Sequence, residues 1–267
     1  SITDPDFTDN VTYILSGTDV EFFEIINNQV KMKDGLSADF ETKNSYSITI
    51  TATDDASHEA SLTYSLQVID VNEAPTLVTL SAMAIDENSA GAVIGDLTTS
   101  DVDDGDTHTY TVSGLDAASF EVVNGELKLK DSVTADYETQ DSYSVTVTTT
   151  DSGELSTFET FTITVNDTND TPTAIALSAI AIDENAAGAV VGTLSTTDDD
   201  VDDTHNYTLS GTNKESFEVN NNQLKLQDTV SANYEVKDTY SITVITTDTG
   251  RLSTSKVFTI TVNDVND

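Results

Sequence analysis

The stretch 143–147 reads Tyr143-Ser144-Val145-Thr146-Val147, and the stretch 161–165 reads Phe161-Thr162-Ile163-Thr164-Val165. In both stretches apolar side chains alternate with hydroxyl side chains, so an extended chain has one apolar face and one polar face. Threonine, valine and isoleucine are branched at Cβ, which favours strands over helices. Both stretches therefore predict half-buried antiparallel strands.

The same kind of pattern extends outward from these stretches. Between residues 73 and 169 we predict seven strands, at about 76–85, 91–99, 107–113, 119–123, 126–130, 142–150 and 157–166. Asn124-Gly125 separates two of the short strands and is typical of a hairpin turn, and Asn221-Asn222 is its counterpart further along the chain. Seven short strands without a helical pattern predict an all-β fold, a seven-stranded Greek-key β-sandwich.

A repeat of 97 residues runs through the whole sequence. Asp-x-Asn triplets begin at Asp70, Asp167 and Asp264, which are equally spaced. Repeats of this length are whole small domains, so the spacing predicts tandem sandwiches arranged end to end. The predicted domains are a partial repeat at 1–72 that lacks its opening strands, and complete repeats at 73–169 and 170–267. Either a longer tandem array or another chain, through β-augmentation, would supply the missing strands.

The composition excludes several classes of function. The 267 residues include 48 Asp and Glu against 10 Lys and Arg, a formal net charge of −38, which excludes a nucleic-acid binder with a basic footprint. The absence of cysteine excludes disulfides, thiolate metal sites and cysteine nucleophiles. With three histidines and no tryptophan, we predict that the segment is not an enzyme. No apolar run approaches the roughly 18 residues of a spanning helix, so we predict no membrane insertion in this segment.

Acidic residues recur at predicted strand ends, in pairs separated by one residue. Asp101 and Asp103 form one pair, and Asp136 and Glu138 form another. Carboxylate and amide oxygens without histidine or cysteine are ligands for hard cations, and sets of six to eight oxygens suit Ca²⁺. The pairs therefore predict bound calcium as the counter-charge. His108 and His205 have no partner histidine nearby in sequence, so we expect surface or edge residues there rather than ligands.

Five motifs in order resemble a cadherin repeat, in the bacterial tandem form found in giant surface adhesins and extracellular matrix proteins. They are Asp-Glu-Asn at 86–88, Asp-x-Asp at 101–103, Asp-Tyr-Glu at 136–138, Asp-Ser-Gly at 151–153 and Asp-Thr-Asn-Asp-Thr-Pro at 167–172. The resemblance implies cadherin- or immunoglobulin-like sandwiches with several Ca²⁺ ions at the repeat junctions. The ligands would come from the end of one repeat, the linker and the start of the next.

The resemblance implies the following ligand sets in this sequence. The first junction would use Asp39, Glu41, Asp70, Asn72, Glu73, Asp101, Asp103 and Asp151. The second would use Glu87, Asp136, Glu138, Asp167, Asn169, Asp170, Asp198, Asp200 and Asp248. Open half-sites at the two ends would use Asp4, Asp6 and Asp54, and Glu184, Glu235, Asp264, Asn266 and Asp267. In the acidic run 198–203 the 97-residue spacing favours Asp198 and Asp200 as the pair over 200 and 202.

The resemblance also implies an extracellular or cell-surface location. We predict a calcium-stiffened structural or extender segment of a cell-surface adhesin or extracellular filament. Its partners would be neighbouring repeats of the same or another chain, in a possible head-to-tail polymer. The alternative is an adhesion module that binds a polysaccharide or another cadherin-like chain, which would require an aromatic patch on one copy that the other copies lack.

Overall fold

The computed structural model describes residues 10–266, and its secondary structure consists of strands and three short 3-10 helices. The first repeat contains β1 (Thr12–Ser16), η1 (Val20–Phe22), β2 (Phe23–Ile26), β3 (Gln29–Met32), β4 (Ser45–Thr53) and β5 (Glu59–Gln67). The second contains β6 (Leu77–Leu80), β7 (Ala84–Asp86), β8 (Val93–Ser100), β9 (Thr109–Ser113), η2 (Ala117–Ser119), β10 (Phe120–Val123), β11 (Glu126–Leu129), β12 (Ser142–Thr150) and β13 (Ser156–Asn166). The third contains β14 (Ala174–Leu177), β15 (Ala181–Asp183), β16 (Val190–Thr197), β17 (Asn206–Ser210), η3 (Lys214–Ser216), β18 (Phe217–Asn220), β19 (Gln223–Leu226), β20 (Thr239–Thr247) and β21 (Ser253–Asn263).

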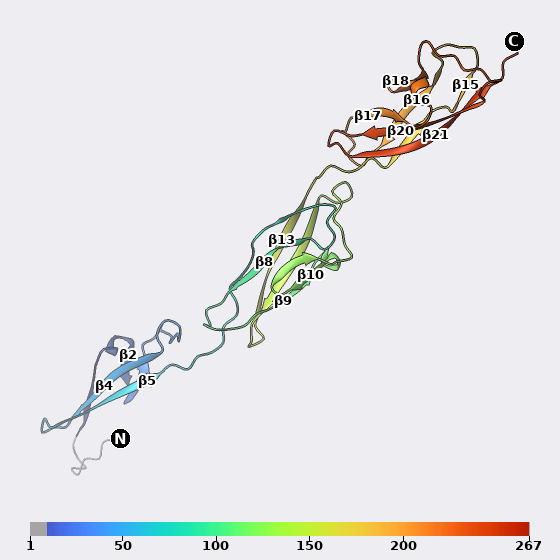
Figure 1. The fold of residues 1–267 in the computed structure, drawn as a ribbon. Coiled ribbons are helices and arrows are strands. Elements are labelled where there is room, and N and C mark those ends of the chain that lie inside the picture. The colour runs from blue at the N-terminus through green and yellow to red at the C-terminus, as the bar shows by residue number, and fades with distance from the viewer. Residues whose placement is uncertain (1–9, 267) are drawn as a thin grey trace. The chain divides into compact units, whose positions relative to one another are not determined.

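The third repeat shows the complete sandwich (Figure 1). One sheet has the strand order β14-β16-β19-β18, and the other has the order β15-β21-β20-β17. The second repeat has the same two strand orders, with each strand 97 residues earlier in the chain. The all-β tandem Greek-key prediction is therefore confirmed.

The first predicted strand of the second repeat, 76–85, is divided in the structure. β6 lies in one sheet, whereas β7 lies in the other and runs parallel to β13. Between them, Ser81 exchanges hydrogen bonds with the backbone of Asp96. A Cβ atom on Gly95 would lie 2.5 Å from the Ser81 hydroxyl, so this close approach requires glycine. The segment Ser81-Ala82-Met83-Ala84 contains no glycine or proline that would mark a break, which is why the sequence did not indicate the change of sheet.

The hairpin turns have the backbone conformation that the sequence predicts. Asn124 and Gly125 have φ values of 53° and 84°, and Asn221 and Asn222 have values of 48° and 62°. Two consecutive residues in the left-handed region form the turn that matches the twist of antiparallel strands. Both predicted turns are therefore confirmed.

The core of a complete repeat lies between its two sheets. In the third repeat Leu224, Ile242 and Ile260 are fully buried. In the first repeat the described strands form the sheets β1-β4-β5 and β2-β3, and only Phe23, Tyr46 and Ile48 form a buried cluster. The side chains of β5 are all exposed.

Chain contacts divide the protein into two compact units, and the border between them passes through the second repeat. The first unit comprises Ser1–Ala82, Ile94–Lys128 and Ser144–Phe161, and the second comprises Met83–Val93, Leu129–Tyr143 and Thr162–Asp267. All the residues of each acidic cluster described below belong to one unit. The repeat boundaries at 72/73 and 169/170 stay a prediction.

Candidate functional site

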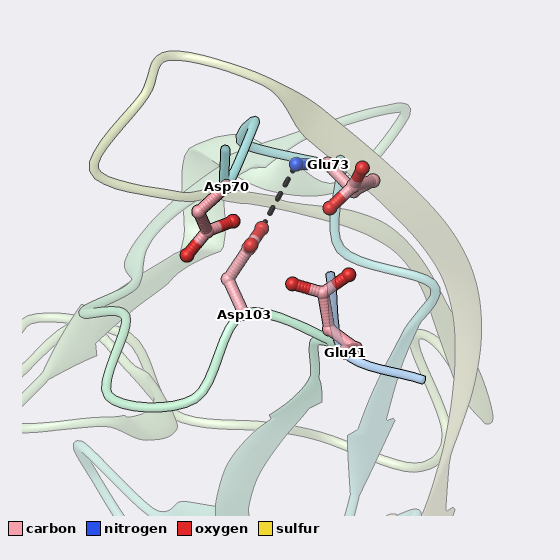
Figure 2. Close-up of side chains that lie close together, drawn as sticks. All are labelled: Glu41, Asp70, Glu73 and Asp103. Atoms are coloured by element: carbon pink, nitrogen blue, oxygen red, sulfur yellow. Dashed lines mark hydrogen bonds between the residues drawn. The ribbon is translucent and has the colours of Figure 1, made fainter. Parts of the chain in front are cut away.

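Four carboxylates converge at the first predicted junction (Figure 2). Glu41 follows β3, Asp70 and Glu73 follow β5, and Asp103 lies in the loop after β8. Each offers one oxygen within 4.8 Å of the others, and the Glu73 N–H donates to Asp103 at 2.8 Å. Loss of surrounding water raises the pKa of Glu73, and the charges of Glu41 and Asp103 raise it further. The carboxylates of this cluster therefore repel one another when they are charged.

The linker asparagine lies against the repeat that follows it. The Asn72 side chain donates to the Asp151 carboxylate at 3.0 Å and to the Glu73 carbonyl at 3.1 Å. A Cβ atom on Gly153 would lie 2.4 Å from the Asn72 amide, so glycine is required there. Asn169, Asp248 and Gly250 repeat this arrangement in the second unit.

Glu87 is the buried acid of the second junction. Its side chain is 3% exposed and accepts hydrogen bonds from the N–H groups of Tyr137 and Thr168, both at 2.7 Å. These bonds connect the residue after β7 with the Asp-Tyr-Glu turn and with the segment after β13. Glu87, Asp136 and Glu138 each offer an oxygen within 4.8 Å of the others.

A second group of acids lies at the same junction. Glu138, Asp167 and Asp200 cluster within 4.8 Å, so Glu138 belongs to both groups. The Asp170 N–H donates to Asp200 at 2.6 Å, and the Asp170 carboxylate accepts from Asn88 at 2.9 Å. Burial and neighbouring carboxylates raise the pKa values of Glu138 and Asp170. The N–H of Asp170 acts to lower the pKa of Asp200, but burial and nearby acids raise it overall.

A third kind of cluster lies within the Asp-x-Asp loop. Asp101, Asp106 and Asp151 each offer an oxygen within 4.8 Å of the others. His108 Nε2 lies 2.9 Å from Asp101 Oδ2, and this bond is the main reason why the pKa of Asp101 is lowered. The His108 side chain is only 14% exposed and directly precedes β9, the edge strand of its sheet, so it agrees with the expected edge position rather than with an exposed surface position. Its partner is an acid seven residues earlier, which a search for a second histidine does not find.

The remaining predicted residues are placed as follows. Asp39 accepts a hydrogen bond from Thr42 N–H, and Asp54 accepts from His58. Glu184, Glu235 and Asp264 lie together at the end of the third repeat, whereas Asn266 is exposed and is not a member of this group. Asp4, Asp6 and Asp267 lie outside the described residues. Asp198 and Asp200 have the hydrogen bonds that Asp101 and Asp103 have 97 residues earlier.

Sequence reasoning missed Asp106 and its counterpart Asp203. Asp106 accepts a hydrogen bond from the Ser152 hydroxyl at 2.9 Å, and Asp203 accepts from the Thr249 hydroxyl. The signal that would have found them is their recurrence at the 97-residue spacing in a loop that already contains the Asp-x-Asp pair.

Comparison with known proteins agrees with this geometry. Residues 178–263 match the profile of the Cadherin domain family. The chain is 29% identical over 296 aligned residues to cadherin-related family member 2 of Mus musculus, covering 99% of this chain and 23% of that protein. The Homo sapiens protein of the same name is 28% identical, again with 23% of its length covered. The chain thus spans about a quarter of the length of these relatives.

Solved structures share the fold. Mouse cadherin-23 EC22-24 superposes with a TM-score of 0.69 and 21% identity, covering 98% of this chain and 89% of that one. Protocadherin gamma B7 extracellular cadherin domains 1-4 gives a TM-score of 0.64 and 23% identity, covering 94% and 66%. The repeats have a cadherin-like fold. The comparisons support such repeats in general and do not distinguish the bacterial tandem form.

The donor atoms of the cadherin-like junctions fit a hard cation. The clustered groups are carboxylates, and neither histidine nor cysteine belongs to the clusters named above. Within the described part of the chain, Asp106 Oδ2 and Asp198 Oδ1 are buried without a hydrogen-bond partner. A buried carboxylate oxygen without a partner is costly unless a cation satisfies it. The residues present therefore fit Ca²⁺ better than a soft metal.

Helices of the described residues are all too short to cross a membrane.

Proposed function

We propose that this chain is a calcium-stiffened extender segment of a cell-surface adhesin or extracellular filament, with Ca²⁺ bound at the repeat junctions. The observation that carries the proposal is the convergence of Glu41, Asp70, Glu73 and Asp103 in one cluster. One of these acids precedes the linker, two lie in it and one follows it, so a shared cation would join two repeats.

Electrostatic repulsion between the carboxylates would favour the binding of Ca²⁺ at each junction. Two unit charges about 4 Å apart interact with about 1 kcal/mol in water and about 4 kcal/mol at an effective dielectric constant of 20. Without a counter-ion, the four carboxylates of the first junction repel one another and favour a splayed linker. Bound Ca²⁺ would supply the opposite charge and accept oxygens from both repeats. The linker would then lose bending freedom, since acids from both of its ends would be held together.

The second junction offers more acids for the same role. Glu87, Asp136 and Glu138 would hold one position, and Glu138, Asp167 and Asp200 another. Because Glu138 belongs to both groups, the two positions would be coupled. Glu87 accepts two backbone N–H groups, which orients its carboxylate before any cation binds.

Localisation and partners follow from the proposed chemistry. Extracellular modules bind Ca²⁺ at about 10⁻⁴ to 10⁻³ M, so such junctions would be filled outside the cell and empty in a cytosol poor in calcium. Glu184, Glu235 and Asp264 form a further acidic group at the end of the third repeat. This group supports a following repeat, of the same or another chain, as the partner in a head-to-tail assembly.

The test is small-angle X-ray scattering of the chain in millimolar calcium and again after chelation, together with thermal unfolding. We expect a longer maximum dimension, a narrower distribution of distances and a higher melting temperature with calcium. Magnesium at the same concentration is the control for ionic strength and divalent charge. If size and melting are indifferent to chelation, the extender proposal is wrong.

A second candidate function is adhesion to another cadherin-like chain. It would act through a groove of about 340 Å³ in the first repeat, lined by Tyr13, Ile50 and Tyr64 among others. The counterparts of Ile50 and Tyr64 in the third repeat, Val244 and Phe258, are buried, so this groove would accept strands of another chain that complete the sandwich. The test is sedimentation of the chain at rising concentration, with and without calcium, against Tyr64→Ser. Concentration-dependent dimerisation that this variant abolishes would support adhesion, whereas a monomer at all concentrations would contradict it. Binding of a polysaccharide by the monomer would identify the other kind of ligand.

A further inference from the structure

We propose that His108 and His205 are positioning residues for a metal position inside the Asp-x-Asp loop of the second and third repeats, and that Asp106 and Asp203 are ligands there. This inference rests on the proposed calcium binding and adds residues to it. It concerns a position that the residues of a single repeat would hold.

The first observation is a buried histidine–aspartate pair that occurs twice. His108 Nε2 lies 2.9 Å from Asp101 Oδ2, and His205 Nε2 lies 2.7 Å from Asp198 Oδ2. The histidine side chains are 14% and 13% exposed, and the aspartate side chains are 4% and 3% exposed. A nitrogen that donates its hydrogen to a carboxylate has no lone pair to offer a metal. Each ring therefore serves to orient the carboxylate.

The second observation concerns the other carboxylate oxygen of each aspartate, Oδ1, which the histidine does not contact. Asp198 Oδ1 is buried and has no hydrogen-bond partner among residues 10–266. In the second repeat the corresponding Asp101 Oδ1 accepts a long bond of 3.3 Å from the Asp103 N–H. Because the ring holds Oδ2, rotation of the carboxylate cannot turn Oδ1 toward water without breaking the buried hydrogen bond.

The third observation concerns the later acid of the loop. Asp106 Oδ1 accepts from the Ser152 hydroxyl, while Asp106 Oδ2 is buried without a partner in the described chain. Asp106 lies in one cluster with Asp101 and Asp151. In the third repeat Asp203 likewise accepts from the hydroxyl of Thr249, which follows Asp248 as Ser152 follows Asp151.

These three observations have one explanation. In each loop one buried carboxylate oxygen lacks a partner, Asp106 Oδ2 in the second repeat and Asp198 Oδ1 in the third, and a cation bound in the loop would satisfy it. Outer residues that orient a ligand typically change metal affinity about 10- to 100-fold when they are replaced. The loop position would bind without help from the preceding repeat except through Asn72 or Asn169, which donate to Asp151 and Asp248.

The experiment compares variants of the whole chain by calcium titration and terbium luminescence. The double variant His108→Phe/His205→Phe removes the donor, His108→Gln/His205→Gln keeps one, and Asp106→Asn/Asp203→Asn removes the ligand charge. Leu115→Ser is the control, since that residue is 88% exposed and belongs to no proposed ligand set. Terbium lifetimes in water and deuterium oxide count the water molecules on the bound ion, a readout that a merely structural role does not change.

We expect the phenylalanine variant to bind two ions per chain about tenfold or more weakly, with additional ion-bound water, while the glutamine variant recovers most of the affinity. The asparagine variant should lose the same two ions, and Leu115→Ser should bind like the wild type. If the phenylalanine variant binds every ion with wild-type affinity and hydration, the positioning role is wrong, although calcium binding stands. The positioning role would also be wrong if the phenylalanine and glutamine variants lost calcium affinity equally and had equally lowered melting temperatures in chelator. If the wild-type chain binds no calcium at millimolar concentration, the proposed function itself fails.

Discussion

The first and third repeats place equivalent residues in opposite environments. Tyr64 and Leu66 on β5 are 43% and 38% exposed, whereas Phe258 and Ile260 at the equivalent positions of β21 are 7% and 0% exposed. The strand pattern is the same in both. The difference is that β14, β15 and β16 cover the third repeat, and the described residues of the first repeat contain no strands at the equivalent positions. The alternating pattern thus specifies a face of the strand, and the opening strands decide whether that face is buried.

The largest expected effect follows from this difference in burial. Ile260→Ala should destabilise the third repeat by about 2–5 kcal/mol, because it leaves a cavity in a closed core. Leu66→Ala should cost under about 1 kcal/mol, since that side chain is already partly in water. Denaturant unfolding of the two variants, followed by hydrogen exchange in each repeat, measures both values. Equal costs would contradict the comparison.

The next effect concerns the two junctions. At the second junction Glu87 accepts two backbone N–H groups, whereas the cluster at the first junction consists of Glu41, Asp70, Glu73 and Asp103. Glu87→Gln should lower calcium affinity at the second junction about tenfold. It should also weaken the hydrogen bonds to Tyr137 and Thr168, at a cost of about 1–2 kcal/mol. Calorimetric titration of both junctions checks this, and affinities at the first junction should not change.

Glu138→Gln should have effects of opposite sign on stability and binding. Burial and like charges raise the pKa of Glu138, so in the absence of metal its charge destabilises the folded state. The variant should therefore raise the melting temperature in chelator and lower calcium affinity. A lower melting temperature in chelator would show that the repulsion is absent.

As the pH falls, some carboxylates should stabilise the metal-free protein and others should destabilise it. Raised pKa values at Glu73, Glu138 and Asp170 mean that protonation relieves repulsion as the pH falls toward their folded-state values, which stabilises the metal-free junctions. The pKa of Asp39 is lowered by the Thr42 N–H, so its stabilisation is present above its unfolded pKa and is lost as the pH falls through its folded value. Melting in chelator between pH 7 and about 3 measures the sum, and Glu138→Gln should reduce the first contribution.

The smallest effect should not differ between the repeats. Asn28 and Asn222 both have φ of 62° in equivalent hairpin turns. Replacing either with alanine should cost about 1 kcal/mol, because alanine is disfavoured in the left-handed region. Denaturant unfolding of each variant measures the two costs. A much larger cost in the third repeat would show that the surrounding core, and not the turn alone, holds this conformation.

Much of the fold could be predicted because it depends on neighbours in sequence. Alternation in 143–147 indicates a strand, and Asn124-Gly125 indicates a turn, through properties of adjacent residues. The division of 76–85 into β6 and β7 could not be predicted in this way, since the change of sheet depends on contacts between Ser81 and Asp96 across 15 residues. The pairing of His108 with Asp101 likewise depends on contacts in the tertiary structure.

The sequence by itself determined the 97-residue repeat, the strand positions and the acidic motifs, because composition and local periodicity encode them. Only the tertiary structure decided which acids meet. It separates Asp103, beside Glu73, from Asp101, beside His108, although these two acids are two residues apart. The chain bends between these two acids, so their side chains do not share one face as they would in an extended strand, and their partners come from distant segments. The hydrogen bond from Asn72 to Asp151, for example, spans 79 residues, a relation that no local pattern contains.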